Sequence, residues 1–588
     1  MSNGDDGTRP GLTPAGWIVI LLVLAGLGFG AYYFLAKKPA PAGPGTVAGG
    51  GATPGGPDAG GGAPPAGGPE APDKNSITTV KEYAYVPQQK LPAVKGTSNY
   101  KWDEKEKVVS FSLNVWSGWL PIYAANKGAK ANAESIFAKK YGFKVELKLI
   151  DDPVSARDAY ASGDVHVLWG TLDMMALFAP DLMKDSRTSP RIFQQIDWSN
   201  GGDGIVVRAA IKSVKDLVGK TVVCAQNSPS QYYITSLLLS AGIAPAKVKF
   251  KYTTTAFEAA AAFVADASLA GCVSWAPDIY KIPERVAGTR ILSTTADANK
   301  LIADVWAVRA DFAKDHPDIV KGLVAGIFEG MEEVKKNPGP ACQWMADAYG
   351  MTSQDIQGMM ADAHATNFAE NKEFFLNANS PTNFERTWKS VSYVYRELGL
   401  IGAPVPFDQV MDFSVLKALD ADGKFTAHKN EYVSTFVTQD YKKVTAEAPI
   451  LTQTIRINFY PNSANLFEPR HDTDSGLAVA GSLYDPNVTG TLERVARLAG
   501  QFDAAVIAIT GHTDSSMKGK APVEAVRTLS TARAEAVRQA LVEKFKFDPK
   551  KFVVEGKGWE VPADPNDTLN QALNRRVEIS VYQPETTK

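Results

Sequence analysis

The sequence predicts a multidomain chain of mixed α/β and α+β class, with a membrane helix ahead of two folded parts. The chain has 588 residues, which at roughly 150 residues per domain is enough for three or four folded units. An uncharged apolar run lies near the start, and short β-branched runs alternate with helical patterns over most of the rest. Such alternation is typical of sheets covered by helices.

Residues 15–36, AGWIVILLVLAGLGFGAYYFLA, predict a transmembrane helix. They carry no charge, and at 1.5 Å per residue they span a hydrocarbon core of about 30 Å. The run ends in aromatic residues followed by Lys37 and Lys38, a pattern typical of a membrane boundary. A signal peptide, the alternative, would have a shorter apolar region and a small-residue cleavage site. We therefore expect residues 1–14 to form a short cytoplasmic tail before an uncleaved anchor.

Residues 37–104 are predicted to form a linker and lead-in. Their first half, PAPAGPGTVAGGGATPGGPDAGGGAPPAGGPEAPD over residues 39–73, has too few apolar side chains to build a core, so we expect a disordered tether. A flexible coil of this length has a root-mean-square span of roughly 30 Å. The domains that follow the membrane helix are therefore expected to be tethered flexibly to the membrane.

Charge, cysteine usage and motifs exclude several classes of function. Lys+Arg 62 against Asp+Glu 64 leave a formal net charge of −2, which gives no basic surface for nucleic acid. The three cysteines, Cys224, Cys272 and Cys342, lack metal-ligand spacing, so we expect no metal site, while a Cys224–Cys272 bridge stays open. The chain also lacks a P-loop, G-x-S-x-G and HExxH, so we expect no enzyme, no catalytic residue and no cofactor.

Residues 105–445 predict an α/β domain with largely parallel sheets. Its apolar runs are VVSFSLNVW, FKVELKLI, VHVLWG, GIVVR, KTVVCAQ, VKFKYT and LAGCVSWAP, separated by helical segments such as DPVSARDAYASG. Strands that alternate with helices in this way are typical of parallel sheets. After VWAVRADFAKDHPDIVKGLVAGIF the pattern becomes mainly helical.

Several of these segments, in order, resemble the periplasmic substrate-binding proteins of ABC importers, in the branch for nitrate, sulfonates, taurine and thiamine precursors. The matching segments include DAYASGDVHVLWGTLD, IKSVKDLVGKTVVCAQNSPSQYYITSLLLSAGI and GCVSWAPDIYKI. The resemblance implies a type II fold with two lobes and a hinge, which closes on a small molecule. The same branch includes a thiamine-pyrimidine synthase with a Cys-rich loop, which this sequence lacks.

Polar and aromatic residues follow several of the predicted strands, where the loops of an α/β sheet form a crevice. The helix start at Ser228 favours an anionic ligand group, whereas the Trp and Asp side chains favour a cation. A zwitterion or an amine-bearing ring satisfies both. Taken singly, each Trp is better explained as a core residue and each Asp as a cap or a solvated turn; their clustering at strand ends is what makes the set a candidate site. The solute-binding candidates are Trp116, Ser117, Trp119, Trp169, Thr171, Asp173, Asp203, Ser228, Ser230, Gln231, Trp275 and Asp278.

Residues 446–588 predict a separate α+β unit with strands QTIRINFY, AAVIAIT, KFVVEGKG and RRVEISVY and two long helices. Asp514 follows the second strand, and Arg533 recurs at helical spacing with Val526, Val537 and Leu541, at the edge of an apolar face. The two charges either form a salt bridge or receive a zwitterion, because a carboxylate binds an ammonium and a guanidinium fork grips a carboxylate.

Four motifs in this unit, GHTD, LSTARAEAV, GKGWEVP and NRRVEI, resemble the C-terminal peptidoglycan-binding domain of the OmpA family. The resemblance implies a βαβαββ-type sandwich in which Asp514 and Arg533 hold the diaminopimelate side chain of the cell-wall stem peptide. Thr513, Asn574 and Arg575 are further candidates. Two departures are a longer separation between Asp514 and Arg533, and Val526 where the family has an Asn.

Together these parts predict a single-pass protein of the inner (cytoplasmic) membrane whose C-terminal bulk lies in the periplasm. Its expected partners are peptidoglycan, a small-molecule solute and the membrane subunits of an ABC importer. The alternative is a structural or sensory envelope tether, in which the solute domain is a spacer. An ion-driven flagellar stator has a similar layout, but its membrane helix carries an ionisable Asp, and residues 15–36 have none.

Overall fold

The computed structural model describes residues 77–583 apart from 473–474, 476, 567 and 569–570. The predicted tail, the membrane helix and the stretch 39–73 lie outside these residues. Within the described ranges, no helix combines the length and the apolar character needed to cross a bilayer.

The first lobe is built on a six-stranded sheet with the order β11-β4-β10-β3-β1-β2. β1, β2 and β3 run parallel, whereas β10 runs antiparallel to β3 and β4. Phe111, Val145 and Val305 are fully buried, because helices cover the sheet and β-branched or aromatic residues pack well there. The strands are β1 (Val108–Leu113), β2 (Lys144–Leu149), β3 (Val167–Thr171), β4 (Pro190–Ser199), β10 (Ala303–Arg309) and β11 (Ala363–Ala365).

The helices of this lobe come from two stretches of the chain. The first stretch gives α2 (Leu120–Asn126), α3 (Ile136–Tyr141), α4 (Pro153–Ala161) and α5 (Leu172–Leu182), preceded by a 3-10 turn, η1 (Ser117–Trp119). The second follows β10 and gives α9 (Ala310–Asp315), α10 (Pro317–Lys336), α11 (Gly339–Tyr349), α12 (Ser353–Met359), α13 (Phe368–Leu376), α14 (Phe384–Glu397) and α15 (Ser414–Ala421).

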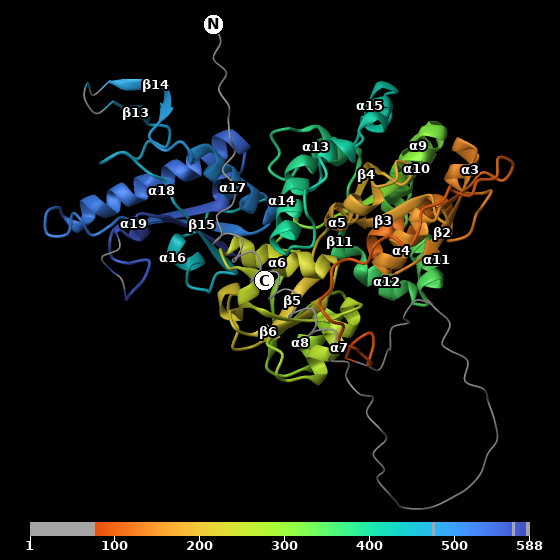
Figure 1. The fold of residues 1–588 in the computed structure, drawn as a ribbon, viewed down its shortest axis with the longest axis horizontal. Helices are drawn as coiled ribbons and strands as arrows, with labels where there is room; N and C mark the ends of the chain where they lie inside the picture. Colours follow the sequence, from red (N-terminus) through yellow and green to blue (C-terminus); the bar gives the residue numbers. More distant parts are fainter. Residues whose placement is uncertain (1–76, 473–474, 476, 567, 569–570, 584–588) are drawn as a thin grey trace, which may run out of the picture. The chain divides into compact units, whose positions relative to one another are not determined.

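The second lobe has a five-stranded sheet with the order β7-β6-β8-β5-β9. Val206 and Val223 pack with α7 and α8, whereas Ile205 and Val222 pack with the cluster that includes α6. Side chains alternate across a strand, so α6 covers one face and α7 and α8 the other (Figure 1). The elements are β5 (Asp203–Arg208), β6 (Thr221–Ala225), β7 (Lys249–Thr253), β8 (Gly271–Trp275), β9 (Thr289–Thr294), α6 (Pro229–Ser240), α7 (Ala256–Ala265) and α8 (Asp278–Arg285).

The chain crosses between the lobes twice, from β4 to β5 and from β9 to β10. A strand that enters a sheet from the other lobe runs against its neighbours, and β5 and β10 are antiparallel to β8 and β3. The sheets are therefore mixed, which corrects the expectation of largely parallel sheets. At the crossings the hydroxyls of Ser199 and Thr295 lie 2.8 Å apart. The two-lobed expectation holds, with a hinge formed by these two segments.

Helix α10 packs closely on α2 at Gly330, where an added Cβ would lie 2.1 Å from the Pro121 carbonyl oxygen. Replacing a helical glycine by alanine ordinarily stabilises a helix by about 1 kcal/mol. Because the backbones touch here, we expect Gly330→Ala to lower the free energy of unfolding by about 1–3 kcal/mol. The control is Gly358→Ala in α12, where nothing lies within 4 Å. Chemical denaturation that shows both variants equally stable would contradict this packing.

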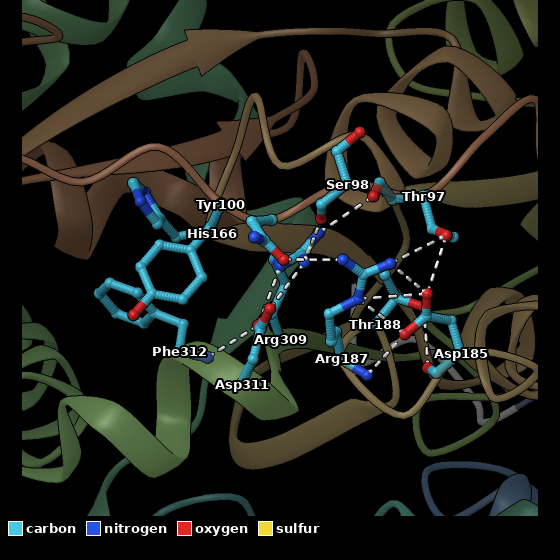
Figure 2. A network of polar contacts seen from close by, with 12 residues as sticks. Thr97, Ser98, Tyr100, His166, Asp185, Arg187, Thr188, Arg309, Asp311 and Phe312 are labelled. Atoms are coloured by element: carbon cyan, nitrogen blue, oxygen red, sulfur yellow. Dashed lines mark hydrogen bonds and ion pairs between the residues drawn. The ribbon is translucent and has the colours of Figure 1, made fainter.

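The lead-in is packed on the lobes over its described part. Thr79 bonds through its amide and hydroxyl to Asp278, and Val86 forms a β-bridge with Tyr252 of β7. Figure 2 shows the next contact, where Arg309 at the end of β10 donates to the carbonyl of Ser98 at 2.7 Å. Residues 77–104 are therefore part of the folded protein instead of a loose linker.

His166 lies beside the same network (Figure 2) and is an ordinary buried histidine. The Ser110 amide donates to its Nδ1 at 2.9 Å, and its Nε2 lies 2.8 Å from the Lys101 carbonyl oxygen. Burial lowers the pKa of His166 to about 4. The ring is neutral at physiological pH, with its proton on Nε2.

The C-terminal unit has a four-stranded sheet with the order β12-β17-β15-β16. α17 and α18 cover one face, and α16 lies against the other beside Val506 and Val553 (Figure 1). The two predicted long helices and three of the four predicted strands are confirmed, the first predicted strand overlaps β12 only at residues 453–455, and a two-stranded hairpin is added. The elements are α16 (Tyr441–Val444), β12 (Leu451–Ile455), β13 (Pro469–His471), β14 (Ala478–Leu483), α17 (Val488–Gln501), β15 (Val506–Gly511), α18 (Val523–Phe545), β16 (Phe552–Gly556), α19 (Gln571–Asn574) and β17 (Val577–Tyr582).

The three cysteines are buried and carry free thiols. Burial raises the pKa of Cys224 and Cys272 well above the ordinary thiol value. An uncharged, enclosed thiol is a poor nucleophile, so both act as apolar core residues.

Candidate functional site

A cavity lies between the two lobes, at the edge where several strands end. Its volume is about 30 Å³, which is room for one or two water molecules. Five of the predicted residues line it: Trp116, Trp169, Thr171, Asp203 and Trp275. The other lining residues are Asn114, Val115, Pro153, Pro229, Ile302 and Asp304.

Two of the cavity's tryptophans are fixed by hydrogen bonds from their indole N–H groups. Trp116 donates to an Asp197 carboxylate oxygen at 3.1 Å, and Trp169 donates to the Ile150 carbonyl at 2.9 Å. Trp116 also packs on the hinge, because an added Cβ at Gly202 would lie 2.2 Å from its ring. Only glycine lets the hinge pass this ring so closely.

Trp275 differs from these two. Its ring meets Phe257 edge-on with 5.5 Å between the ring centres. Its indole N–H is buried and finds no acceptor in the part of the chain that the structure describes. A buried donor without a partner is costly in a folded protein, so this N–H is available to a bound molecule.

Buried carboxyl groups gather on the same side of the cavity. Asp304 on β10 lies opposite Asp197 on β4 in the strand register, and Asp203 begins β5 and accepts from the Ser199 hydroxyl at 2.8 Å. All three side chains are at most 5% exposed. Burial raises the pKa of Asp197 and Asp203 to about 7, and that of Asp304 well above its ordinary value.

These raised pKa values predict a stability that falls as the pH rises. An Asp in the unfolded chain titrates near 3.9, so between pH 4 and 7 the folded chain binds more protons than the unfolded chain. The free energy of unfolding contributed by Asp203 is therefore present at low pH and is lost across this window. We expect Asp203→Asn to be more stable than the wild type at pH 8 by about 2 kcal/mol, and equal to it at pH 4. Urea denaturation at both pH values checks this; a pH-independent difference would contradict it.

The structure places three predicted residues behind the cavity wall in the first lobe. Trp119 is fully buried, and its N–H donates to Asn114 Oδ1 at 2.7 Å. The Ser117 hydroxyl donates to the Met359 carbonyl. Asp173 accepts from the Tyr395 hydroxyl of α14 at 2.9 Å, and burial raises its pKa to about 6. These residues support the cavity wall without lining it.

Four predicted residues in the second lobe also lie outside the lining. Asp278 binds Thr79, and the Ser228 hydroxyl donates back to the Ala225 carbonyl instead of capping α6. Gln231 donates to the Tyr252 hydroxyl, and the fully buried Ser230 hydroxyl has no partner among the described residues. The N-terminus of α6 reaches the cavity through Pro229.

The C-terminal site is a cavity of about 770 Å³ between β15, the start of β17 and α18. Asp514, Thr513, Arg533 and Arg575 all line it, together with Phe459. Asp514 pairs with Arg575 and accepts from Ser516. Arg533 instead donates from Nε to the Ser463 carbonyl at 3.0 Å and lies 4.9 Å from the Phe459 ring centre. The expected partner of Asp514 is therefore corrected from Arg533 to Arg575.

This arrangement keeps opposite charges on two walls of one cavity. Burial alone would raise the pKa of Asp514, but the Ser516 and Arg575 donors outweigh it and hold that pKa below its ordinary value. Asp514 is ionised at neutral pH. The side chain of Arg575 is 54% exposed, so it can leave Asp514 when another cation arrives. Asn574 is buried and bonds to Ala563 and Thr568, which makes it a loop clamp.

Comparisons with known proteins agree with a division of the chain into a two-lobed part and a C-terminal unit. Residues 131–341 match the family described as NMT1/THI5 like, and residues 482–576 match the OmpA family. A taurine-binding periplasmic protein from Escherichia coli is 27% identical over 219 residues, which are 37% of this chain and 65% of that protein. Outer membrane protein Omp38 from Acinetobacter baumannii is 33% identical over 104 residues, 18% of this chain and 27% of that protein. The chain thus spans less than two thirds of the length of either relative.

Two solved structures are also similar. The aliphatic sulphonate binding protein SsuA from Escherichia coli aligns with 16% identity and a TM-score of 0.40, over 52% of this chain and 91% of that one. The nitrate-binding protein NrtA from Synechocystis aligns with 15% identity and a TM-score of 0.39, over 54% and 89%. Residues 131–341 of this chain are thus similar to the NMT1/THI5-like family, and residues 482–576 to the OmpA family.

Proposed function

We propose that this chain is a non-enzymatic solute-binding protein of the cell envelope that captures a small molecule between its two lobes. The supporting observation is the cavity that aromatic and carboxyl side chains of both lobes line at the hinge. Because the cavity holds only one or two waters, the lobes must open before a solute enters and close around it afterwards. The solute would then pass to the membrane subunits of an ABC-type importer.

The C-terminal domain would attach the chain non-covalently to peptidoglycan through diaminopimelate. The free end of that residue carries an ammonium and a carboxylate. Asp514 offers an ionised carboxylate for the former and Arg533 a guanidinium fork for the latter, from walls of one cavity. Residues 15–36 would anchor the other end in the inner membrane, and both folded domains would lie in the periplasm.

A second candidate function is an envelope tether in which the solute domain is a spacer or a signalling module. The small volume of the interlobe cavity, about 30 Å³, favours it, because a spacer needs no entry path. A solute-binding protein needs lobes that open and then close around a ligand, whereas a spacer does not.

Thermal unfolding of the full chain in mild detergent separates these functions. A ligand of the cleft at 100 times its dissociation constant should stabilise the folded chain by about 2.7 kcal/mol. Taurine is the first solute to try, because one similar protein is named for it. A spacer would show no shift with taurine, sulfonates, amines or a small-molecule extract of the producing cells, and that result would contradict solute capture.

A further inference from the structure

The described lining of the interlobe cavity carries acidic side chains and no basic side chain that would balance their charge. It contains Asp203 and Asp304 and no Lys, Arg or His. Asp304 is 5% exposed, and its polar side-chain neighbour is another acid, Asp197. The Asp304 and Asp197 carboxyl groups share a hydrogen bond, in which Asp304 is the protonated partner because burial and the Asp197 charge raise its pKa well above the ordinary value. Ionising two buried carboxyl groups that face each other on neighbouring strands is costly, and a bound cation would offset that cost.

The fold holds these acids in place firmly. One Asp197 oxygen accepts from Trp116. Gly118 is required beside it, since an added Cβ would lie 1.7 Å from Asp197 Oδ2. Asp304 pairs across the strands with Thr171 on its other side. The carboxyl groups therefore have little freedom to turn away to solvent.

The aromatic rings complete a site for a cation. Trp116 and Trp169 line the same cavity, and the N–H of each is already bonded elsewhere, so the rings are what they offer to a ligand. A cation over a tryptophan face is favoured, more so when it is removed from water. Trp275, whose indole N–H has no acceptor among the described residues, lines the same cavity, as does Pro229 at the start of α6. A ligand group beside Trp275 should therefore be a hydrogen-bond acceptor.

We propose that the solute of this cleft carries an ammonium group, which binds at Asp304 and Asp203 beside Trp116 and Trp169, and an acceptor group that faces Trp275 and the start of α6. The inference rests on the solute-binding function proposed above and narrows it. Simple anions such as nitrate or an unsubstituted sulfonate are excluded, because no basic side chain in the described lining offsets the two aspartates.

Matched ligand pairs test this on the full chain in detergent by isothermal titration at pH 8. Taurine differs from ethanesulfonate, and 4-aminobutyrate from butyrate, only in the amino group. We expect the amine of at least one pair to bind at least about tenfold more tightly than its anion. Asp304→Asn keeps the shape of the side chain and should weaken amine binding at least about tenfold. The control Asp266→Asn changes a partly exposed carboxylate of the second lobe that pairs with Lys251, outside the cavity lining, and should bind as the wild type does.

Asp304→Asn has a second readout that shows whether it folds. Replacing a buried carboxyl group, which is costly to ionise, by a neutral amide should raise the melting temperature of the ligand-free chain at pH 8. Equal affinity for taurine and ethanesulfonate, or unchanged amine binding by Asp304→Asn, would overturn the ammonium site and leave solute capture standing. Failure of all four compounds, of ethylammonium and of choline to bind would contradict both proposals.

Discussion

Replacing Asp514 and Arg533 together by alanine is expected to abolish binding of the chain to purified murein sacculi. Each side chain is proposed to make a charge-assisted contact with the stem peptide, worth about 1.5–3 kcal/mol. Loss of one contact should weaken binding at least about tenfold, and loss of both about a hundredfold or more. Co-sedimentation of the full chain with sacculi measures this.

The controls come from the same domain. Arg527 lies on α18 like Arg533 and forms exposed ion pairs with Glu524 and Glu560, but it does not line the cavity. Arg527→Ala should bind sacculi as the wild type does. Arg533→Lys keeps the charge but loses the planar fork, so it should recover only part of the binding. Wild-type binding by the double variant would refute the assignment of this site.

Replacing Arg309 by methionine should destabilise the first lobe more than any surface change. Arg309 is fully buried, and it donates to the carbonyls of Tyr160, Ala161 and Ser98 and to both oxygens of Asp311 (Figure 2). Methionine fills similar space but leaves these acceptors without a donor. We expect the free energy of unfolding to fall by about 3–5 kcal/mol, measured by urea denaturation.

Arg187 in the same network is the matched control. It pairs with Asp185 and bonds to Asn99 (Figure 2), but its side chain is 39% exposed. Solvent weakens such a pair, so Arg187→Met should cost about 0–1 kcal/mol. Equal losses for the two variants would mean that burial of Arg309 does not decide the stability of this lobe.

Apolar runs in the sequence predicted most strands correctly. The prediction failed where a buried strand carries polar side chains. Strands β1, β2, β3 and β5 to β8 lie where the apolar runs place them. β4 was not predicted, because Gln194, Gln195 and Asp197 interrupt its pattern. All three are fully buried, and Gln194 accepts from the Trp306 indole at 3.2 Å. Such pairing between distant strands leaves no local signal.

The cavity was predicted in part for a similar reason. Trp116, Trp169 and Thr171 were found because they end or follow parallel strands. Asp304 was missed because it lies near the start of a strand. β10 runs antiparallel to β3, so its beginning lies beside the end of β3, where the cavity is. The available signal was a single Asp inside the apolar run LIADVWAV.

In the C-terminal domain, the positions of Asp514 and Arg533 on their elements were predictable from the sequence, but the ion-pair partner of Asp514 was not. Asp514 follows β15 and Arg533 lies on α18, as the motifs predicted. The partner of Asp514, Arg575, lies just before β17, which borders β15 in the sheet. Strand order decides this neighbour, and strand order depends on contacts far apart in the sequence.

Native mass spectrometry of the full chain, purified in detergent from the cells that make it, tests solute capture most directly. We expect a non-covalent adduct of one small amine, retained by the wild type and lost by Asp304→Asn. The bare mass of the chain, unchanged after incubation with a small-molecule extract of those cells, would contradict a working binding cleft.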